Sequence, residues 1–288
     1  MAFEIRDKTG YAAPDEWGMH MAEHKKHTCL ITGASAGIGA AIAREYAARG
    51  WDLALVARRE EPMVALATEL KKDFGTKSHI FSADLFEPTA VQDLMVRLDK
   101  KKIRIDGLVN NAGYGHPGSY MDSAWEDHAG FLQLMLHMPC ELAHAVLPHM
   151  REQRFGRIIN VASLAGHIPG SKGHTLYAAV KSFLIKFSQS LNLEMQPYDV
   201  HVSALCPGFT YSEFHDVNDT REGVSKLPDF MWMEAEECAE LGVEACERNR
   251  AVFIPGGVNK TIAATAKILP ESIAMSLMAK NSERIRKG

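Results

Sequence analysis

The stretch LITGASAGIGAAIAREYAARG, residues 30–50, joins an apolar run, a glycine-rich turn and an amphipathic segment. Gly33, Gly37 and Gly39 follow the apolar run and lead into apolar residues at helical spacing. Glycines at such a strand-to-helix turn let the backbone approach a pyrophosphate, toward which the first N–H groups of the helix point. The spacing is GxxxGxG, so a tight turn without a ligand also fits. Its place at the start of an alternating α/β pattern favours a nucleotide site.

Short apolar runs recur along the rest of the chain, with amphipathic segments between them. We expect seven strands, at residues 28–32, 52–57, 78–83, 105–111, 156–163, 200–206 and 251–255. Apolar residues at three- and four-residue spacing predict helices at 39–50, 61–75, 123–154, 174–196 and 234–249. Nearly continuous apolar strands that alternate with helices indicate a parallel sheet covered on both faces. The prediction is a single α/β domain, a doubly wound seven-stranded parallel sheet with a Rossmann fold.

The composition excludes several classes of protein. Of 288 residues, 46% are apolar and 24% charged, as in soluble globular proteins. A net charge of −4 gives no general footprint for nucleic acid. There is no run of 18 apolar residues and no apolar signal segment at the N-terminus, so we expect neither a membrane span nor secretion. Five cysteines without CxxC spacing fit reduced thiols in a cytoplasmic protein.

Residues 1–26 are polar and are expected to form an extension that precedes the domain. His20 and His24 in this extension and His27 directly after it are spaced so that a helix would place them on one face. Three histidines without a carboxylate partner on a terminal arm are more often exposed to solvent than bound to metal. We therefore expect no metal site.

A tyrosine and a lysine four residues apart lie in the segment predicted to be helical at 174–196. Tyr177 and Lys181 would share one face of that helix. A nearby ammonium group favours the phenolate and lowers the pKa of a tyrosine, which would make the pair a usable acid and base. Ser163 lies fourteen residues earlier, far enough for a loop to return its hydroxyl to the same place. Alternatively, the segment is an ordinary helix with a buried tyrosine and an exposed lysine.

The end of the second predicted strand indicates which nicotinamide cofactor would bind. An acidic residue about twenty positions past the glycines would contact the ribose 2′-hydroxyl of NAD. Ala57 occupies that position, and Arg58 and Arg59 follow it. Guanidinium groups can pair with a 2′-phosphate, which favours NADP. Two solvated surface arginines are the alternative.

Several motifs occur together in one order. TGASAGIG follows the first predicted strand, NNAG (residues 110–113) the fourth and PGFTYSEF (207–214) the sixth, with Ser163, Tyr177 and Lys181 between the last two. Over residues 27–257 the chain resembles the short-chain dehydrogenase/reductase family. The resemblance implies that Tyr177 is the general acid or base and that Lys181 lowers its pKa and binds the nicotinamide ribose. Ser163 would hold the substrate oxygen.

The resemblance also implies a cofactor site. Asp84 would contact the adenine ring, Asn111 and Gly113 would line the cleft, and Pro207 and Gly208 would lie against the nicotinamide. The complete set of implied contacts is Gly33, Ser35, Gly37, Ile38, Gly39, Arg58, Arg59, Asp84, Asn111, Gly113, Tyr177, Lys181, Pro207 and Gly208. The expected activity is NADP(H)-dependent interconversion of a carbonyl compound and its alcohol, in a homodimer or homotetramer.

Two positions depart from the family's pattern. An asparagine that helps to hold a water near the lysine falls at Met135, although Gln133 or His137 could substitute. Ala36 stands where NADP-preferring members often carry a basic residue. A catalytically silent protein that senses NADP(H), or the same enzyme using NAD, therefore remain alternatives.

The two remaining segments carry expectations of their own. Residues 209–233 are predicted to form a lid over the substrate, or else a surface excursion, with Phe209, Phe214, Phe230 and Trp232 as candidate substrate contacts. Residues 258–288 are predicted to form two short helices separated by Pro270. We expect this extension to dock on the body or on a neighbouring subunit, and its basic residues make contact with an anionic membrane the alternative.

Overall fold

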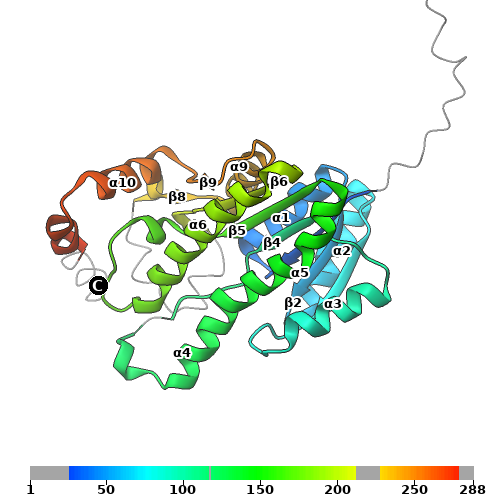
Figure 1. Cartoon of the computed structure of the whole chain (residues 1–288), viewed down its shortest axis with the longest axis horizontal. Helices are drawn as coiled ribbons and strands as arrows, with labels where there is room; N and C mark the ends of the chain where they lie inside the picture. The colour runs from blue at the N-terminus through cyan, green and yellow to red at the C-terminus, as the bar shows by residue number, and fades with distance from the viewer. Residues whose placement is uncertain (1–25, 117, 212–227, 279–288) are drawn as a thin grey trace, which may run out of the picture.

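A seven-stranded parallel sheet forms the centre of the computed structural model, which describes residues 26–116, 118–211 and 228–278 (Figure 1). Its strand order is β3-β2-β1-β4-β5-β6-β9, and every neighbouring pair is parallel. The strands are β1 (Thr28–Thr32), β2 (Asp52–Ala57), β3 (Ser78–Ser82), β4 (Gly107–Asn110), β5 (Gly156–Val161), β6 (Val200–Leu205) and β9 (Val252–Phe253). The predicted doubly wound sheet is confirmed, with several strands shorter than expected.

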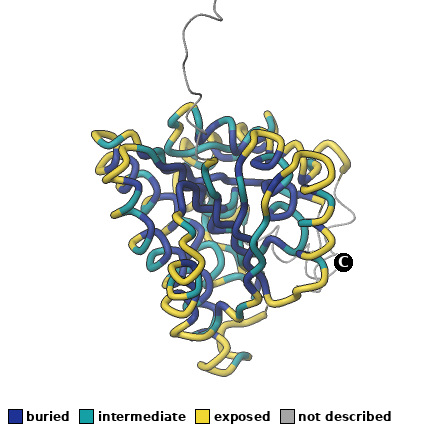
Figure 2. The backbone as a smooth tube through the Cα atoms, turned by 90° about the vertical axis from the view of Figure 1, so that its right-hand side faces the viewer, coloured by how far each residue is buried: buried dark blue, intermediate teal, exposed yellow. Residues whose placement is uncertain are grey.

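Helices cover both faces of this sheet. One face is covered by α1 (Gly37–Ala48), α2 (Glu60–Phe74) and α9 (Ala235–Glu247). The other face is covered by α3 (Ala90–Lys100), α5 (Met138–Gln153) and α6 (Thr175–Met195). Figure 2 shows the buried strands between two layers whose outer turns are exposed. Helix α3 is not among the helices that the sequence pattern predicted.

The helix expected at 123–154 is present over residues 125–153 and contains a π-helical turn. It consists of α4 (Trp125–Leu132), a π-helical segment (Gln133–His137) and α5. Pro139 lies in the first turn of α5, where it has no N–H to donate and its ring would clash with the carbonyl four residues earlier in a regular α-helix. The wider π turn accommodates this proline.

The sheet order reverses between β1 and β4, which lie side by side. In sheets of this kind, connections from the two strands leave toward opposite faces and open a crevice at their carboxyl ends, where ligands bind. The glycine-rich turn follows β1 and the NNAG segment follows β4. The fold therefore brings both motifs to one crevice.

Only the two ends of the predicted lid fall within the described residues. Phe209–Thr210 (β7) pairs with Trp232–Met233 (β8), and a short 3-10 turn at Asp229–Met231 precedes β8. The ring of Trp232 stacks on Tyr211, with 4.8 Å between the ring centroids. Phe214 lies outside the described residues.

The C-terminal segment begins with α10 (Gly257–Ile268), and residues 271–278 are again helical. Helix α10 packs against the 3-10 turn Leu164–His167, which follows β5. Further 3-10 turns lie at Tyr120–Asp122 and Gln196–Tyr198. None of the described helices is both long and apolar enough to cross a membrane.

The N-terminal histidines can be followed only at His27, because His20 and His24 lie outside the described residues. His27 stacks on Phe155, with ring centroids 4.2 Å apart, and its Nδ1 lies 3.5 Å from the carboxylate of Asp106. The Trp51 ring lies 5.0 Å away as well, so two aromatic rings and one acidic side chain surround His27. The described part of the chain holds no group of three His, Cys, Asp or Glu side chains placed to bind a metal ion.

Candidate active site

The glycine-rich turn after β1 is pressed against the segment after β4. Gly33 has a φ of +67°, and a Cβ there would lie 2.7 Å from Nδ2 of Asn111. A Cβ at Gly39 would meet the carbonyl of Gly33 and the same Asn111 side chain. Asn111 in turn donates from Nδ2 to the carbonyls of Thr32 and Gly33, at 3.0 and 3.2 Å. This close packing requires residues without a side chain, and α1 begins at Gly37 with its N-terminus at the turn, so the turn fits an anionic phosphate.

Two arginines lie at the end of β2, next to the glycine turn. Arg58 and Arg59 are both exposed, and Nη2 of Arg59 donates to the hydroxyl of Ser35 at 3.4 Å. The guanidinium group of Arg58 lies 5.8 Å from the ring centroid of Phe86. Asp84 is exposed nearby and accepts a hydrogen bond from the Phe86 N–H. The structure thus places Arg59 in contact with Ser35 of the glycine turn and Arg58 beside Phe86.

Ser163, Tyr177 and Lys181, which come from the segment after β5 and from α6, also lie together. The side chains of Ser163 and Tyr177 are hydrogen-bonded. The ammonium Nζ of Lys181 lies 5.6 Å from the ring centroid of Tyr177 and donates to the carbonyl of Val161 at 2.7 Å. Ser163 caps the 3-10 turn after β5, where its hydroxyl accepts from the Ala165 N–H at 3.1 Å. The lysine is buried, so the alternative of an exposed lysine is wrong.

The expected lowering of the Tyr177 pKa is wrong for this geometry. Burial raises the pKa of Tyr177 to about 12, although its hydrogen bond with Ser163 acts in the opposite direction. Burial also lowers the pKa of Lys181 to about 8, partly offset by Cys206. The helical spacing places the two side chains near each other, but it could not show that burial outweighs the hydrogen bond with Ser163 in setting the pKa of Tyr177.

Met135 lies in the π-helical segment and is 1% exposed. A Cβ on Gly113 would lie 2.6 Å from its sulfur, so the Met135 side chain fills the space directly beside the NNAG segment. Gln133 is half-buried and His137 is exposed. Across the described residues, neither of these two side chains is hydrogen-bonded to Lys181. The structure therefore shows no amide in the place that the family's pattern reserves for asparagine.

The sequence and the fold of this chain are similar to those of known proteins. Residues 27–222 match the family model described as short chain dehydrogenase. The chain belongs to the short-chain dehydrogenase family. Oxidoreductase UcpA of Salmonella typhimurium is 35% identical over 185 residues, which cover 63% of this chain and 68% of UcpA.

Two solved structures are similar to this short-chain dehydrogenase. A short-chain dehydrogenase from Sphingobium yanoikuyae in complex with NADPH has a TM-score of 0.74 and 32% identity, over 85% of this chain and 96% of that one. The bulky-bulky ketone specific alcohol dehydrogenase from Comamonas testosteroni has a TM-score of 0.70 and 29% identity, with the same two coverages. Both likenesses extend over most of the described domain.

The Pro207–Gly208 turn, which follows β6, lies next to the segment that carries Ser163 in this short-chain dehydrogenase. The Leu164 N–H donates to the carbonyl of Pro207 at 2.8 Å, which joins the Ser163 segment to the Pro207–Gly208 turn. Cys206 precedes this turn and is fully buried, and burial raises the pKa of its thiol to about 12. A lone cysteine in an apolar strand carries no signal in the sequence, so the position of Cys206 beside this turn was not predicted.

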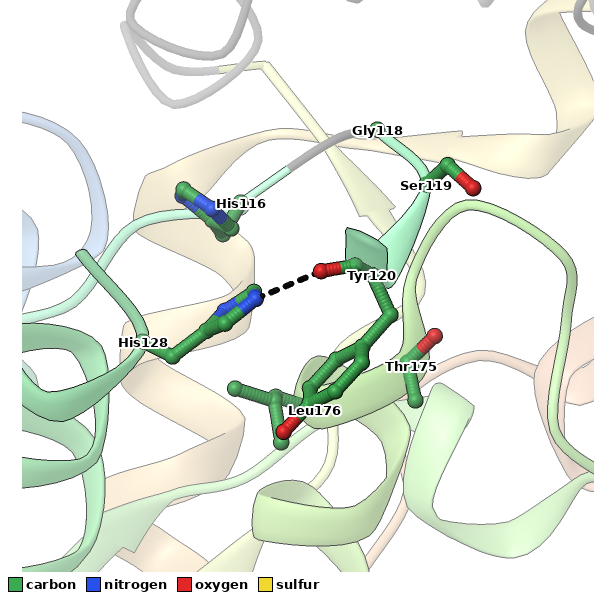
Figure 3. A pocket seen from close by; sticks show the side chains of 7 residues that line it. All are labelled: His116, Gly118, Ser119, Tyr120, His128, Thr175 and Leu176. Atoms are coloured by element: carbon green, nitrogen blue, oxygen red, sulfur yellow. Dashed lines mark hydrogen bonds between the residues drawn. The ribbon is translucent and has the colours of Figure 1, made fainter. Parts of the chain in front are cut away.

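A small pocket lies next to the N-terminus of α6, two residues before Tyr177 (Figure 3). Its lining combines two histidines, a tyrosine and small polar residues, namely His116, Gly118, Ser119, Tyr120, His128, Thr175 and Leu176. His128 stacks on the Tyr120 ring at 4.4 Å and its Nε2 lies 2.9 Å from the Tyr120 carbonyl oxygen. The lining joins the segment 116–128 to Thr175 and Leu176 of α6, which are distant from it in sequence, so no local spacing motif predicts this pocket.

Proposed function

We propose that this short-chain dehydrogenase is an NADP(H)-dependent oxidoreductase that interconverts a carbonyl compound and its secondary alcohol. The observation that carries the proposal is the cluster of Ser163, Tyr177 and Lys181, whose hydroxyl groups are hydrogen-bonded beside a buried cation. Such a cluster can give a proton to an oxygen atom and stabilise the charge that results.

The three side chains would divide the work at one oxygen. In reduction, the Tyr177 hydroxyl donates its proton to the carbonyl oxygen, and Ser163 holds that oxygen by a hydrogen bond. The pKa of about 12 keeps Tyr177 protonated and ready to donate at neutral pH. Lys181, still mainly protonated there with a pKa of about 8, would favour the phenolate that forms. The nicotinamide supplies the hydride when it is bound.

The residues at the end of β2 support NADP over NAD. Ala57 offers no carboxylate to a ribose 2′-hydroxyl, whereas Arg58 and Arg59 are exposed at the glycine turn. Guanidinium groups bind phosphate strongly because they donate two parallel hydrogen bonds. The related Sphingobium structure contains NADPH. The other contacts to the cofactor would be those that the family resemblance implies, which include Gly33 at the glycine turn, Asn111 after β4 and the Pro207–Gly208 turn.

The substrate would be a small organic carbonyl compound, reduced rather than formed because cells keep NADP largely reduced. The related Comamonas enzyme is specific for bulky ketones, and the rings of Phe209, Tyr211 and Trp232 at the base of the predicted lid suit an apolar substrate. We further propose a homodimer or homotetramer in the cytoplasm. All five cysteines are free, which fits a reducing compartment.

The test measures oxidation of NADPH with a panel of ketones and aldehydes as substrates. The loss of NADPH absorbance reports the rate. NADH is run in parallel, and Tyr177→Phe is the control because it removes only the proton donor. We expect turnover with NADPH that disappears in the variant. Equal turnover by the variant would refute the role of Tyr177, and equal rates with NADH would refute the cofactor preference.

One observation favours a second function. Met135 is apolar and buried where the family's pattern has an amide, so a path that returns protons to Lys181 would lack this group. A silent sensor would bind NADPH tightly and reduce none of the carbonyl compounds. Met135→Asn separates the two readings: if the missing amide limits the enzyme, the variant gains turnover without gaining affinity for NADPH.

A further inference from the structure

The first turn of α10 follows the last strand of the sheet in the chain and contacts the Pro207–Gly208 turn. Asn259 lies in this turn and is 6% exposed. Its Nδ2 donates to the carbonyl of Pro255 at 2.9 Å, which fixes the orientation of the amide. A polar side chain as buried as this one normally has a structural or functional reason to be retained.

The Asn259 amide lies directly against Gly208. A Cβ built on Gly208 would lie 2.6 Å from Nδ2 and 2.7 Å from Cγ of Asn259, well inside van der Waals contact. The φ of Gly208 is not in the left-handed region, so its conformation does not require glycine. The close approach of the Asn259 side chain is therefore what excludes a side chain at Gly208.

The Pro207–Gly208 turn connects Asn259 to the catalytic serine. The carbonyl of Pro207 accepts the Leu164 N–H at 2.8 Å, and Leu164 follows Ser163 in the chain. Helix α10 also packs on the 3-10 turn Leu164–His167. A shift of the Asn259 amide would thus displace the Pro207–Gly208 turn and the segment that carries Ser163.

We propose that Asn259 is a positioning residue of the active site, which holds the Pro207–Gly208 turn, and through it Ser163, in the geometry that reaction requires. The C-terminal segment is then part of the catalytic unit and not an appendage. The inference rests on the proposed function, since it concerns the same reacting groups. A displacement of about 1 Å at such groups can cost roughly 10²-fold in rate.

The test compares four proteins: the wild type, Gly208→Ala, Asn259→Gly and the double variant. The readouts are kcat and KM for a carbonyl substrate at saturating NADPH, with the midpoint of thermal unfolding alongside. We expect Gly208→Ala to lower kcat by roughly 10²-fold, because its Cβ meets the amide. Asn259→Gly should lower kcat less, because the Pro207–Gly208 turn loses its contact with the amide but is not displaced by a steric clash. The double variant regains about tenfold over Gly208→Ala, because the space for the methyl group is restored.

Thr261→Ala is the matched control, because it removes a hydrogen bond to the Gly257 carbonyl in the same turn of α10 without contact to Gly208. It should leave kcat unchanged. A double variant no faster than Gly208→Ala, or kcat losses that follow the unfolding midpoint across all variants, would overturn the proposal.

Failure of the proposed function gives a different result. It appears in the wild type as absence of turnover with any carbonyl compound. The same four proteins are then compared by affinity for NADPH, and the proposal requires the double variant to bind more tightly than Gly208→Ala. Equal or weaker binding by the double variant overturns it.

Discussion

The two ends of the crevice are built in different ways. The glycine turn is formed mainly by backbone, because Gly33 and Gly39 pack closely against Asn111. The exposed arginines lie beside this turn, at the end of β2. The Tyr177 end is formed by side chains. Lys181 is buried there, and its ammonium group donates a hydrogen bond to a backbone carbonyl. A backbone site depends on local sequence and shape, whereas a buried side-chain site depends on everything that surrounds it.

This difference explains which expectation failed. Phosphate recognition by a strand, a glycine turn and a helix N-terminus needs residues close in sequence. The pKa of Tyr177 depends instead on how much water its neighbours exclude, and here burial dominates. The two ends should therefore respond differently to mutation: the glycine end through cofactor affinity, and the tyrosine end through the rate of the chemical step.

The largest effect is expected from Tyr177→Phe. Loss of a general acid typically costs about 10²–10⁴-fold, so kcat should fall by roughly 10³-fold while affinity for NADPH changes little. Single-turnover kinetics and NADPH fluorescence titration measure the two quantities separately. A comparable loss of NADPH affinity would show that the two ends are not separate.

Gly39→Ala should act at the other end. The new Cβ would meet the Gly33 carbonyl and the Asn111 amide, and overpacking of this kind costs about 1–3 kcal/mol. We expect the Kd for NADPH to rise roughly 10–100-fold. Gly257→Ala is the matched control, because a Cβ there would meet nothing within 4 Å. Unchanged affinity in Gly39→Ala would remove the glycine turn from the cofactor site.

A smaller and more selective effect is expected from Arg58→Ala combined with Arg59→Ala. Hydrogen bonds to charged groups contribute about 1.5–3 kcal/mol, so kcat/KM with NADPH should fall by roughly 10–100-fold, while NADH is used as before. Arg49→Ala serves as the control, since Arg49 follows α1 at its far end and pairs with Glu45. Equal losses with both cofactors would argue for a structural role of the arginines.

The smallest effect is a dependence on pH at the tyrosine end. Because burial lowers the pKa of Lys181 to about 8, the ammonium charge is lost as pH rises through that value, and kcat for reduction should decline several-fold. Lys181→Arg keeps its charge and, though slower, should lack this step. Identical profiles would assign the decline to another group.

The same shift affects stability with a definite sign. Between about pH 8 and the ordinary lysine value of 10.5, the unfolded chain binds more protons at this residue than the folded protein does. The contribution of Lys181 to the free energy of unfolding therefore rises with pH across that interval. Denaturant unfolding of wild type and Lys181→Met at two alkaline pH values measures it.

The fold was predictable because its signals are local. Each strand is a short apolar run and each helix an amphipathic stretch, and both patterns remain visible whatever the rest of the chain does. The helical segment expected at 123–154 is present, but the sequence pattern did not predict the π-helical turn at Gln133–His137 inside it. The α3 segment was missed as well, although its apolar residues Val91, Leu94 and Leu98 have helical spacing and are buried.

The sequence by itself determined the sheet, the glycine turn and the identity of Ser163, Tyr177 and Lys181 as a set, since these follow from periodicity, spacing and motif order. Only the tertiary structure decided how that set is poised. The direction of the Tyr177 pKa, the contact of Met135 with Gly113 and the support of Gly208 by Asn259 all involve residues or solvent exclusion that no local pattern encodes. Burial and close packing are properties of the assembled fold, because they arise where segments distant in sequence meet.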